Sequence, residues 1–327
     1  MLAIELQQQL KINTPSELVK LNIPELQAIN SELWCKRDDL LHPIISGNKW
    51  RKLQALLMYA IKTKARCILS FGGAHSNHLH ALAYCCQQLN IRFVSIVRAH
   101  KNQALSPTMR DIIGWGAELH FSSRLEYTDR TNDSLLAHYQ QLFDADIVVP
   151  EGGSCTHALL GVKSMIDELK TQINCVSDKR IFDHVYAPVG SGATLAGMIK
   201  YGADVFKQVN GIAVLKGQGY LENLVEQLLH NSVNNDINRH VDSAIDNWQI
   251  LHQYHHGGYA KTTSALAYFI RQFKQTHEIE LETVYSAKCF FAINQLIESG
   301  QISKNSKLLA IHTGGLQGLR AQKNINV

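Results

Sequence analysis

The chain has 327 residues, about twice the length of a common single domain, so its length favours two domains built around separate cores. With 45% hydrophobic and 18% charged residues, the composition is that of an ordinary globular protein. The 32 basic and 28 acidic residues are spread along the sequence and leave a net charge of only +4, which argues against nucleic acid as a partner.

The apolar segments also argue against a membrane partner. The longest runs, such as CILSF and DIVVP, have the length of a strand and are far too short to span a bilayer. The first residues, MLAIELQQQLKINTP, lack the basic segment, apolar core and cleavage site of a secretory signal. Seven cysteines at scattered spacing show no paired disulfide framework. We therefore expect a cytoplasmic protein.

Strand and helix patterns alternate through most of the chain. Apolar residues at helical spacing predict helices over 49–64, 77–89, 106–116, 132–143, 156–173, 194–206 and 220–230. Short apolar runs between them predict strands over 67–71, 92–99, 117–121, 146–153, 181–190, 211–217 and 307–315. This alternation predicts an α/β fold with two doubly wound domains and mostly parallel sheets.

Four loops that follow predicted strands are rich in glycine, serine or threonine: 72–78, 150–154, 188–197 and 311–318. In open parallel sheets, ligands bind beyond the carboxyl ends of the strands, where such loops bring backbone amides close to an anion. The sequence of the third loop, PVGSGATLAG, is suited to a phosphate. Its small and hydroxyl residues are Gly190, Ser191, Gly192, Ala193 and Thr194.

Two better-known phosphate loops do not match this spacing. A dinucleotide loop requires G-x-G-x-x-G, and here the third glycine, Gly197, comes two positions late. A P-loop requires a lysine after its closing glycine, where this chain has Met198. A glycine-rich turn that binds nothing remains an alternative for the loop taken alone.

Lys49 stands at the first turn of a predicted helix, where its amine is either a solvated surface charge or a reactive group. A phosphate ligand that carries an aldehyde would give the amine a purpose, because the two groups form a Schiff base. Pyridoxal phosphate is such a ligand. Ser76 and Asn77, at the start of another helix, could hold a substrate carboxylate and a ring oxygen, or could simply cap that helix. The nearby histidines lack partners at metal-site spacing, so no metal is expected.

The combination of motifs resembles the pyridoxal-phosphate enzymes grouped as 1-aminocyclopropane-1-carboxylate (ACC) deaminases and D-cysteine desulfhydrases. The resemblance extends from about Lys36 to Leu319 and covers nearly the whole chain. It is carried by KRDDLLHPIISGNKWRKL, GGAHSNHLHALA, PEGGS, PVGSGATLAGM, GGYA, VYSAK and IHTGGLQGL. It implies a tryptophan-synthase-β-like fold, with a large cofactor-binding domain (1–50 and 160–327), a small domain (51–159) and a homodimeric assembly.

The resemblance also implies a role for each matching residue. Lys49 would be the Schiff-base lysine, Asn77 would bond the ring oxygen, and Ser76 would hold the substrate carboxylate. The residues from Gly190 to Thr194 would hold the phosphate. Tyr259 and Tyr285 match two active-site tyrosines of the family, although each taken alone is more often a half-buried aromatic with its hydroxyl at the surface.

One position bears on the reaction. In ACC deaminases a glutamate follows the tyrosine of VYEGK and lies by the pyridine nitrogen, whereas this chain has Ser286 there, with Thr313 as a second partner. A hydroxyl supplies no full counter-charge, so we expect a largely neutral ring and a weaker electron sink. This favours β-elimination from a small amino acid to give a 2-oxo acid and ammonia over opening of a cyclopropane.

Other readings stay open. Departures from the family pattern include Glu282 and Thr283 in place of aspartate and proline, and Ala287 in place of glycine. They leave ACC deaminase and a non-catalytic cofactor-binding protein as alternatives. A nicotinamide-dependent oxidoreductase rests only on the α/β pattern and a glycine loop with the wrong spacing.

Overall fold

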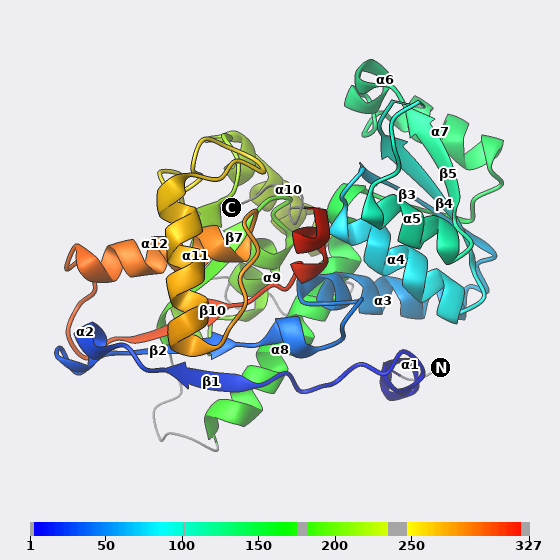
Figure 1. Ribbon diagram of the computed structural model, residues 1–327. Helices are drawn as coiled ribbons and strands as arrows, with labels where there is room; N and C mark the ends of the chain where they lie inside the picture. The colour runs from blue at the N-terminus through cyan, green and yellow to red at the C-terminus, as the bar shows by residue number, and fades with distance from the viewer. Residues whose placement is uncertain (1–2, 101, 175–181, 235–246, 322–327) are drawn as a thin grey trace.

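Two β-sheets flanked by helices lie side by side in a computed structural model that describes residues 3–100, 102–174, 182–234 and 247–321 (Figure 1). The larger sheet has six strands in the order β1-β2-β10-β7-β8-β9, and the smaller has four in the order β5-β4-β3-β6. All neighbouring strands run parallel except β1, which is antiparallel to β2. The prediction of an α/β fold with two mostly parallel sheets is confirmed.

The strands of the larger sheet come from both ends of the described chain, and those of the smaller sheet from its middle. The larger sheet contains β1 (Leu18–Leu21), β2 (Glu32–Lys36), β7 (Phe182–Val189), β8 (Phe206–Ala213), β9 (Trp248–Leu251) and β10 (Lys307–Ile311). The smaller sheet contains β3 (Cys67–Gly73), β4 (Arg92–Arg98), β5 (Glu118–Ser122) and β6 (Ile147–Val149). The division at 1–50, 51–159 and 160–327 remains a prediction.

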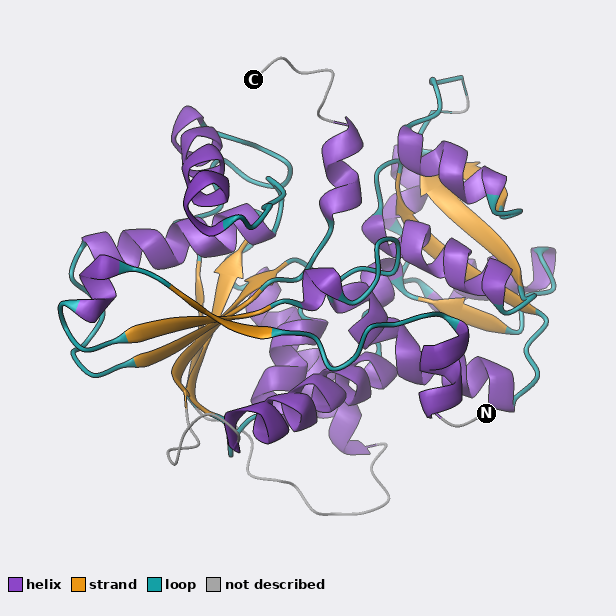
Figure 2. Ribbon diagram, turned by 60° about the horizontal axis from the view of Figure 1, so that its bottom comes forward, coloured by secondary structure: helices purple, strands orange, loops and turns teal. Residues whose placement is uncertain are grey.

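Helices cover both faces of the larger sheet (Figure 2). The helices of the first half are α1 (Ala3–Gln9), α2 (Pro24–Gln27), η1 (Asp38–Leu40), α3 (Asn48–Lys62), α4 (Asn77–Gln88), α5 (Pro107–Gly114), α6 (Arg124–Thr128) and α7 (Asp133–Leu142). Those of the second half are η2 (Glu151–Gly153), α8 (Thr156–Asn174), α9 (Ala193–Tyr201), α10 (Tyr220–Asn234), α11 (Ser264–His277), α12 (Ser286–Glu298) and η3 (Leu316–Ala321). Within the described residues, none of these helices has the length and apolarity to cross a bilayer.

Helix α3 connects the two halves of the molecule. Trp50, Leu53 and Leu57 belong to the core beneath the smaller sheet. The opposite side of α3 lies against α8, where a Cβ added to Gly161 would be only 1.5 Å from the carbonyl oxygen of Arg51. Because such a contact is impossible for any residue with a side chain, the two helices approach backbone to backbone. Lys49 is thereby fixed relative to both sheets.

A buried ion cluster reinforces this contact. The guanidinium of Arg51 on α3 bonds Asp38 at 2.8 Å and Glu168 of α8 at 2.6 Å, and Lys36 of β2 lies 3.0 Å from Glu168. Burial opposes ionisation of Asp38, but the charge and hydrogen bonds of Arg51 hold the pKa of its carboxyl below the usual value. The cluster ties α3, α8 and the larger sheet together.

The structure corrects the boundaries of two predicted elements. The helix expected to reach residue 206 ends at Tyr201, and the strand expected from 211 to 217 is β8, which starts at Phe206 and ends at Ala213. The N–H of Gly202 closes the last turn of α9, and its carbonyl accepts the N–H of Phe206. The glycine ends the helix, which starts the strand earlier than the apolar run suggests.

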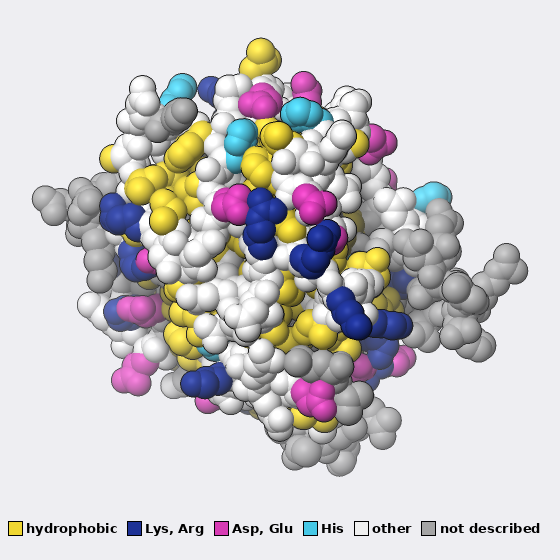
Figure 3. Space-filling model, turned by 90° about the vertical axis from the view of Figure 1, so that its right-hand side faces the viewer, with side chains coloured by type: hydrophobic (Ala, Val, Ile, Leu, Met, Phe, Trp, Pro, Cys, Tyr) yellow, Lys and Arg dark blue, Asp and Glu magenta, His cyan; other side chains and the backbone are white. Residues whose placement is uncertain are grey.

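The surface around the smaller sheet carries both signs of charge. On the face shown in Figure 3, basic and acidic side chains lie close together among hydrophobic and uncharged ones. This agrees with the even spread of charge along the sequence.

Candidate active site

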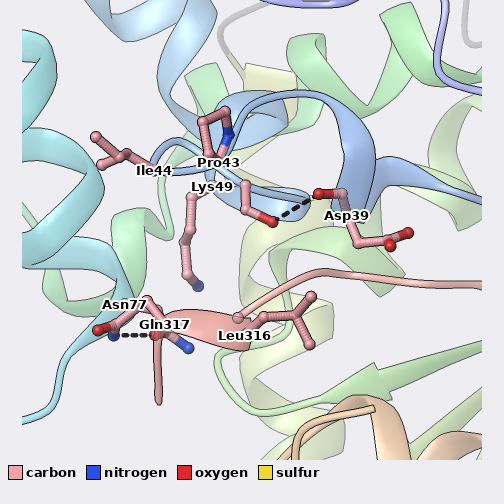
Figure 4. A pocket seen from close by; sticks show the side chains of 9 residues that line it. Asp39, Pro43, Ile44, Lys49, Asn77, Leu316 and Gln317 are labelled. Atoms are coloured by element: carbon pink, nitrogen blue, oxygen red, sulfur yellow. Dashed lines mark hydrogen bonds between the residues drawn. The ribbon is translucent and has the colours of Figure 1, made fainter. Parts of the chain in front are cut away.

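The loops after β3 and β6 of the smaller sheet meet those after β7 and β10 of the larger sheet. In both sheets the strand order reverses between these neighbours, so the carboxyl ends of β3 and β6, and of β7 and β10, leave room for a ligand. A cavity of about 250 Å³ lies in this region, and the side chain of Lys49 points toward Asn77 and Gln317 within it (Figure 4).

The position of Lys49 depends on a tight contact just before α3. Gly47 has a φ of 64°, and a Cβ on it would lie 1.8 Å from the carbonyl oxygen of Thr313. The N–H of Asn48 donates to that same oxygen at 3.2 Å. Only glycine allows this approach, which joins the first turn of α3 to the loop after β10.

The amine of Lys49 is suited to nucleophilic chemistry. Burial lowers its pKa to about 8, with Glu282 acting in the opposite direction. Among the described residues, no carboxylate lies within ion-pair distance of this amine. A large share of Lys49 is therefore neutral and reactive near pH 8.

The glycine-rich turn after β7 forms the proposed phosphate cradle. Gly192, with a φ of 81°, caps α9 at its N-terminus, so that the free amides of the first turn face the loop. The hydroxyl of Thr194 lies 3.5 Å from the amide nitrogen of Asn48, which brings the loop next to α3. Ala193 is buried in the first turn of α9, where its amide alone can serve a ligand.

Lys52 is a site residue that the sequence reasoning missed. Its Nζ donates to the Ser191 hydroxyl at 2.9 Å and to the Gly152 carbonyl at 3.2 Å, so it joins the loops after β6 and β7. Burial, followed by the charge of Lys49, lowers its pKa well below the ordinary lysine value. A buried lysine whose hydrogen-bond partners in the described part of the chain are neutral fits a phosphate group, because the charge of a phosphate would favour the protonated amine. Lys52 lies three residues after Lys49, about one helical turn, so it is on the same face of the helix. This spacing was the signal in the sequence that could have identified it.

The start of α4 has two roles. The Ser76 hydroxyl accepts the N–H of Leu79 at 3.2 Å, so the capping alternative for this residue is observed. Its part in binding a substrate carboxylate remains a prediction. The side chain of Asn77 reaches the cavity, where its Oδ1 accepts a hydrogen bond from the amide of Gln317.

The two predicted tyrosines come together. The hydroxyls of Tyr259 and Tyr285 are 3.1 Å apart, and their rings meet edge to face with centroids 6.1 Å apart. Burial, followed by the neighbouring Tyr259, raises the pKa of Tyr285 well above the usual value, so its hydroxyl stays protonated. A Cβ on Gly190 would lie 3.1 Å from the Tyr285 ring, which places that ring beside the phosphate cradle.

The turn that leads into α12 brings a carboxylate that the sequence did not place in the site. The Ser286 hydroxyl accepts the backbone N–H of Glu282 at 2.9 Å, while the Glu282 carboxylate accepts N–H groups of Val284, Tyr285 and Ser286. Burial raises the pKa of Glu282 to about 6 despite these hydrogen bonds. Ser286 is thus engaged in its own turn, and a full negative charge lies beside it near neutral pH.

A second, smaller cavity adjoins the first, and four of the predicted residues line it: Lys49, Asn77, Tyr285 and Thr313. Asn48, Gly314 and Gly315 complete the lining of this smaller cavity. Ser191 and Thr194 reach α3 through Lys52 and Asn48, and Tyr259 adjoins through Tyr285. Among the described residues, no group of three or more acidic, histidine or cysteine side chains is arranged to hold a metal ion.

A parallel α/β fold with a reactive lysine beside a phosphate cradle defines a cofactor-dependent enzyme of the pyridoxal-phosphate class. The model of the pyridoxal-phosphate dependent enzyme family matches residues 10–314, and the chain belongs to this family. Its cofactor is pyridoxal phosphate.

Relatives and solved structures agree with this assignment. The chain is 30% identical to a bifunctional D-cysteine desulfhydrase/ACC deaminase of Arabidopsis thaliana, over 93% of this chain and 77% of that protein. It is also 30% identical to a putative ACC deaminase of Thermotoga maritima, over 94% and 96%. The crystal structure of an ACC deaminase homologue superposes with a TM-score of 0.79 at 24% identity, covering 98% of this chain and 97% of that chain.

Proposed function

We propose that the protein is a pyridoxal-phosphate-dependent lyase that converts a small amino acid to a 2-oxo acid and ammonia by β-elimination, as a D-cysteine desulfhydrase does. The carrying observation is that Lys49 lines the cavity, while Lys52, one helical turn further along α3, donates a hydrogen bond to Ser191 of the phosphate loop at 2.9 Å. The relatives named for these two activities add support.

Each residue has a proposed task. The Lys49 amine would hold the cofactor and would move a proton at the substrate α-carbon, for which a pKa of about 8 suits it. Lys52, Ser191 and the amides of the first turn of α9 hold the phosphate. When bound, the cofactor supplies the electron sink that stabilises negative charge at the α-carbon.

The remaining residues bind or protonate the substrate. Ser76 and the first amides of α4 orient its carboxylate. The protonated hydroxyl of Tyr285, held by Tyr259, donates a proton to the departing group or takes part in the transfer at the α-carbon. Thr313, and Ser286 by the family resemblance, would be the residues nearest the ring nitrogen.

The first experiment is spectroscopic. Purified protein loaded with pyridoxal phosphate should show a visible absorbance band, which Lys49→Ala should abolish and the exposed control Lys62→Ala should retain. A band that persists in Lys49→Ala would end the proposal. Release of pyruvate, sulfide and ammonia from D-cysteine, compared with L-cysteine and other amino acids, then tests the reaction.

ACC deaminase is the second candidate, and the position of Glu282 favours keeping it. Its buried carboxylate lies beside Ser286, where the sequence lacks the family's glutamate. Release of 2-oxobutyrate and ammonia from ACC by the wild type, compared with Ser286→Glu, separates the two. Failure of every substrate despite a normal absorbance band would favour a non-catalytic cofactor-binding protein.

We also propose a homodimer that acts in the cytoplasm on a small amino acid, without a nucleic-acid or membrane partner. The family resemblance supports the dimer, and the dispersed charge and short apolar runs support the rest. Light scattering of the cofactor-loaded protein tests the assembly, and a monomeric mass at micromolar concentration would contradict it.

A further inference from the structure

We propose that Gln317 is a positioning residue, and that a hydrogen-bonded chain from Asp111 through Arg320 and Gln317 fixes the amide of Asn77 with its N–H group facing the cofactor. The proposal rests on the role of Asn77 toward the ring oxygen given above. It concerns how that role is enforced by residues outside the site motifs.

The chain of contacts crosses between the two halves of the molecule. Gln317 and Arg320 belong to η3, the turn after β10 that ends the described chain and lies beside α4 and α5 (Figure 1). The Gln317 amide donates to Oδ1 of Asn77 at the start of α4. The Gln317 oxygen accepts from Arg320 at 3.2 Å and from Thr108 of α5 at 3.1 Å.

The orientation of both amides follows from the chemistry of arginine. A guanidinium has only N–H donors, so the atom of Gln317 that faces Arg320 must be the carbonyl oxygen. The amide nitrogen of Gln317 therefore faces Asn77, whose oxygen must be the acceptor. This leaves the Nδ2 group of Asn77 as the donor that is free for a ligand. A threonine hydroxyl alone would not settle this, since it both donates and accepts.

The outer end of the chain is anchored by a carboxylate. Arg320 bonds Asp111 of α5 at 2.5 Å, and Asp111 also bonds His80 of α4 at 2.8 Å. Asp111 has its pKa lowered by hydrogen bonds with Arg320 and His80, although partial burial acts to raise it. It remains ionised and holds the guanidinium toward Gln317.

Asn77, at the inner end of this chain of contacts, lies next to Gly315, which has no side chain to fill the space beside it. Gly315 has a φ of 89°, and a Cβ on it would lie 2.9 Å from Nδ2 of Asn77. Gly315 lines the small cavity together with Lys49 and Asn77. The free N–H group of Asn77 therefore lies over bare backbone at the edge of the site, where a ring oxygen can meet it.

A pH titration of the visible absorbance band tests the chain of contacts. With the cofactor bound, the band would report the proton on the nitrogen that joins it to Lys49, and an N–H donated by Asn77 to the ring oxygen would favour loss of that proton. Loss of that donor should raise the midpoint by about one pH unit, a tenfold change in proton affinity. Gln317→Glu has nearly the same shape, but its carboxylate can only accept hydrogen bonds, from Arg320 on one side and Asn77 on the other. The Asn77 amide must then turn its N–H group toward residue 317 and its oxygen toward the ring.

Because the new carboxylate also acts through space, the comparison must be a double-mutant cycle with Asn77→Ala. We expect Asn77→Ala and Gln317→Glu each to raise the midpoint, and Gln317→Glu to add much less when it is combined with Asn77→Ala. Arg320→Met should show the same dependence on Asn77 with a smaller shift. Gln275→Glu, an exposed change on α11, should leave the midpoint unchanged.

Equal shifts from Gln317→Glu in the two backgrounds would overturn the inference, as would a midpoint unaffected by Asn77→Ala. Neither result would affect the proposed function, because the band itself would still report a bound cofactor. Absence of the band from the wild type would instead end the proposed function. Thermal melting of each variant confirms that the shifts come from folded protein.

Discussion

The amine of Lys52 and the hydroxyl of Ser191 are 2.9 Å apart, although 139 positions separate them in the chain. This contact joins the helix that carries the reactive lysine to the turn expected to hold the phosphate. Because the lysine is buried and bonds only neutral oxygens in the described part of the chain, its charge is balanced only when an anion is present.

Lys52→Met should therefore weaken cofactor binding without unfolding the protein. Hydrogen bonds to charged groups contribute about 1.5–3 kcal/mol, which corresponds to a rise of roughly 10- to 100-fold in the dissociation constant. Titration of cofactor-free protein with pyridoxal phosphate measures this change. Lys62→Met, at the exposed end of the same helix, is the control, and an unchanged constant in Lys52→Met would show that the phosphate lies elsewhere.

The lowered pKa of Lys49 predicts the pH dependence of cofactor attachment. Only the neutral amine reacts with the aldehyde, so the rate should rise with pH and level off just above the pKa of about 8. Stopped-flow recording of the visible band measures the rate. The side-chain amine of a free lysine whose α-amine is blocked should instead react faster with rising pH up to about pH 10.4. The same pH dependence in the protein would contradict a buried Lys49 amine.

Glu282 predicts a pH dependence of stability in the cofactor-free protein. Its folded pKa of about 6 lies above the ordinary value of 4.5, so the folded state holds the proton more tightly. The stability from protonated Glu282 is present below pH 4.5 and is lost as the pH rises through 6, by about 2 kcal/mol. Glu282→Gln does not titrate, so the unfolding free energy of wild type minus variant should fall by this amount between pH 4 and 7. A constant difference in urea unfolding would show that the carboxylate is solvated.

Arg51→Met should strongly destabilise the protein. Removal of one partner from a buried ion cluster leaves Asp38 and Glu168 without compensation, which costs about 3–5 kcal/mol. Chemical denaturation gives the value. Lys163→Met breaks the exposed pair with Asp167 on α8 and should cost less than about 1 kcal/mol. Equal losses of unfolding free energy in the two variants would mean that the buried cluster stabilises the protein no more than the exposed pair does.

Tyr285→Phe should separate catalysis from cofactor binding. The variant loses a protonated hydroxyl 3.1 Å from that of Tyr259, and loss of a proton-transfer group lowers kcat by about 100-fold or more. The visible band should remain. Tyr268→Phe, on the exposed side of α11, should behave as wild type. Full activity in Tyr285→Phe would assign the proton transfer to Lys49 alone.

The sequence predicted the alternation of strands and helices well because both sheets are mainly parallel and buried. Their strands form short apolar runs between helices with a clear polar face, as β3 and α3 illustrate. The strands β1, β2 and β9 and the helices α11 and α12 were not predicted. A four-residue strand such as β1, with one buried residue, carries too little pattern to be recognised.

Candidate site residues could be predicted where the chemistry requires a particular residue type within a motif. They were missed where only the three-dimensional fold brings a residue to the site. Lys49, Asn77 and Tyr285 could be named as candidates because family motifs surround them, and the structure places all three at one cavity. Lys52 resembles any helix lysine until the fold buries it against Ser191. Glu282 was noted only as a departure from the family, since its place beside Ser286 depends on how the chain turns into α12.

Gly161 has a consequence for which side of the site is rigid. With no side chain between α8 and the backbone of Arg51, these two helices cannot slide past each other without losing the contact. The α3–α8 contact is therefore the rigid side of the site, whereas the turn of Leu316–Ala321 is joined to α4 and α5 by polar hydrogen bonds, each of which costs less to break than close-packed backbone.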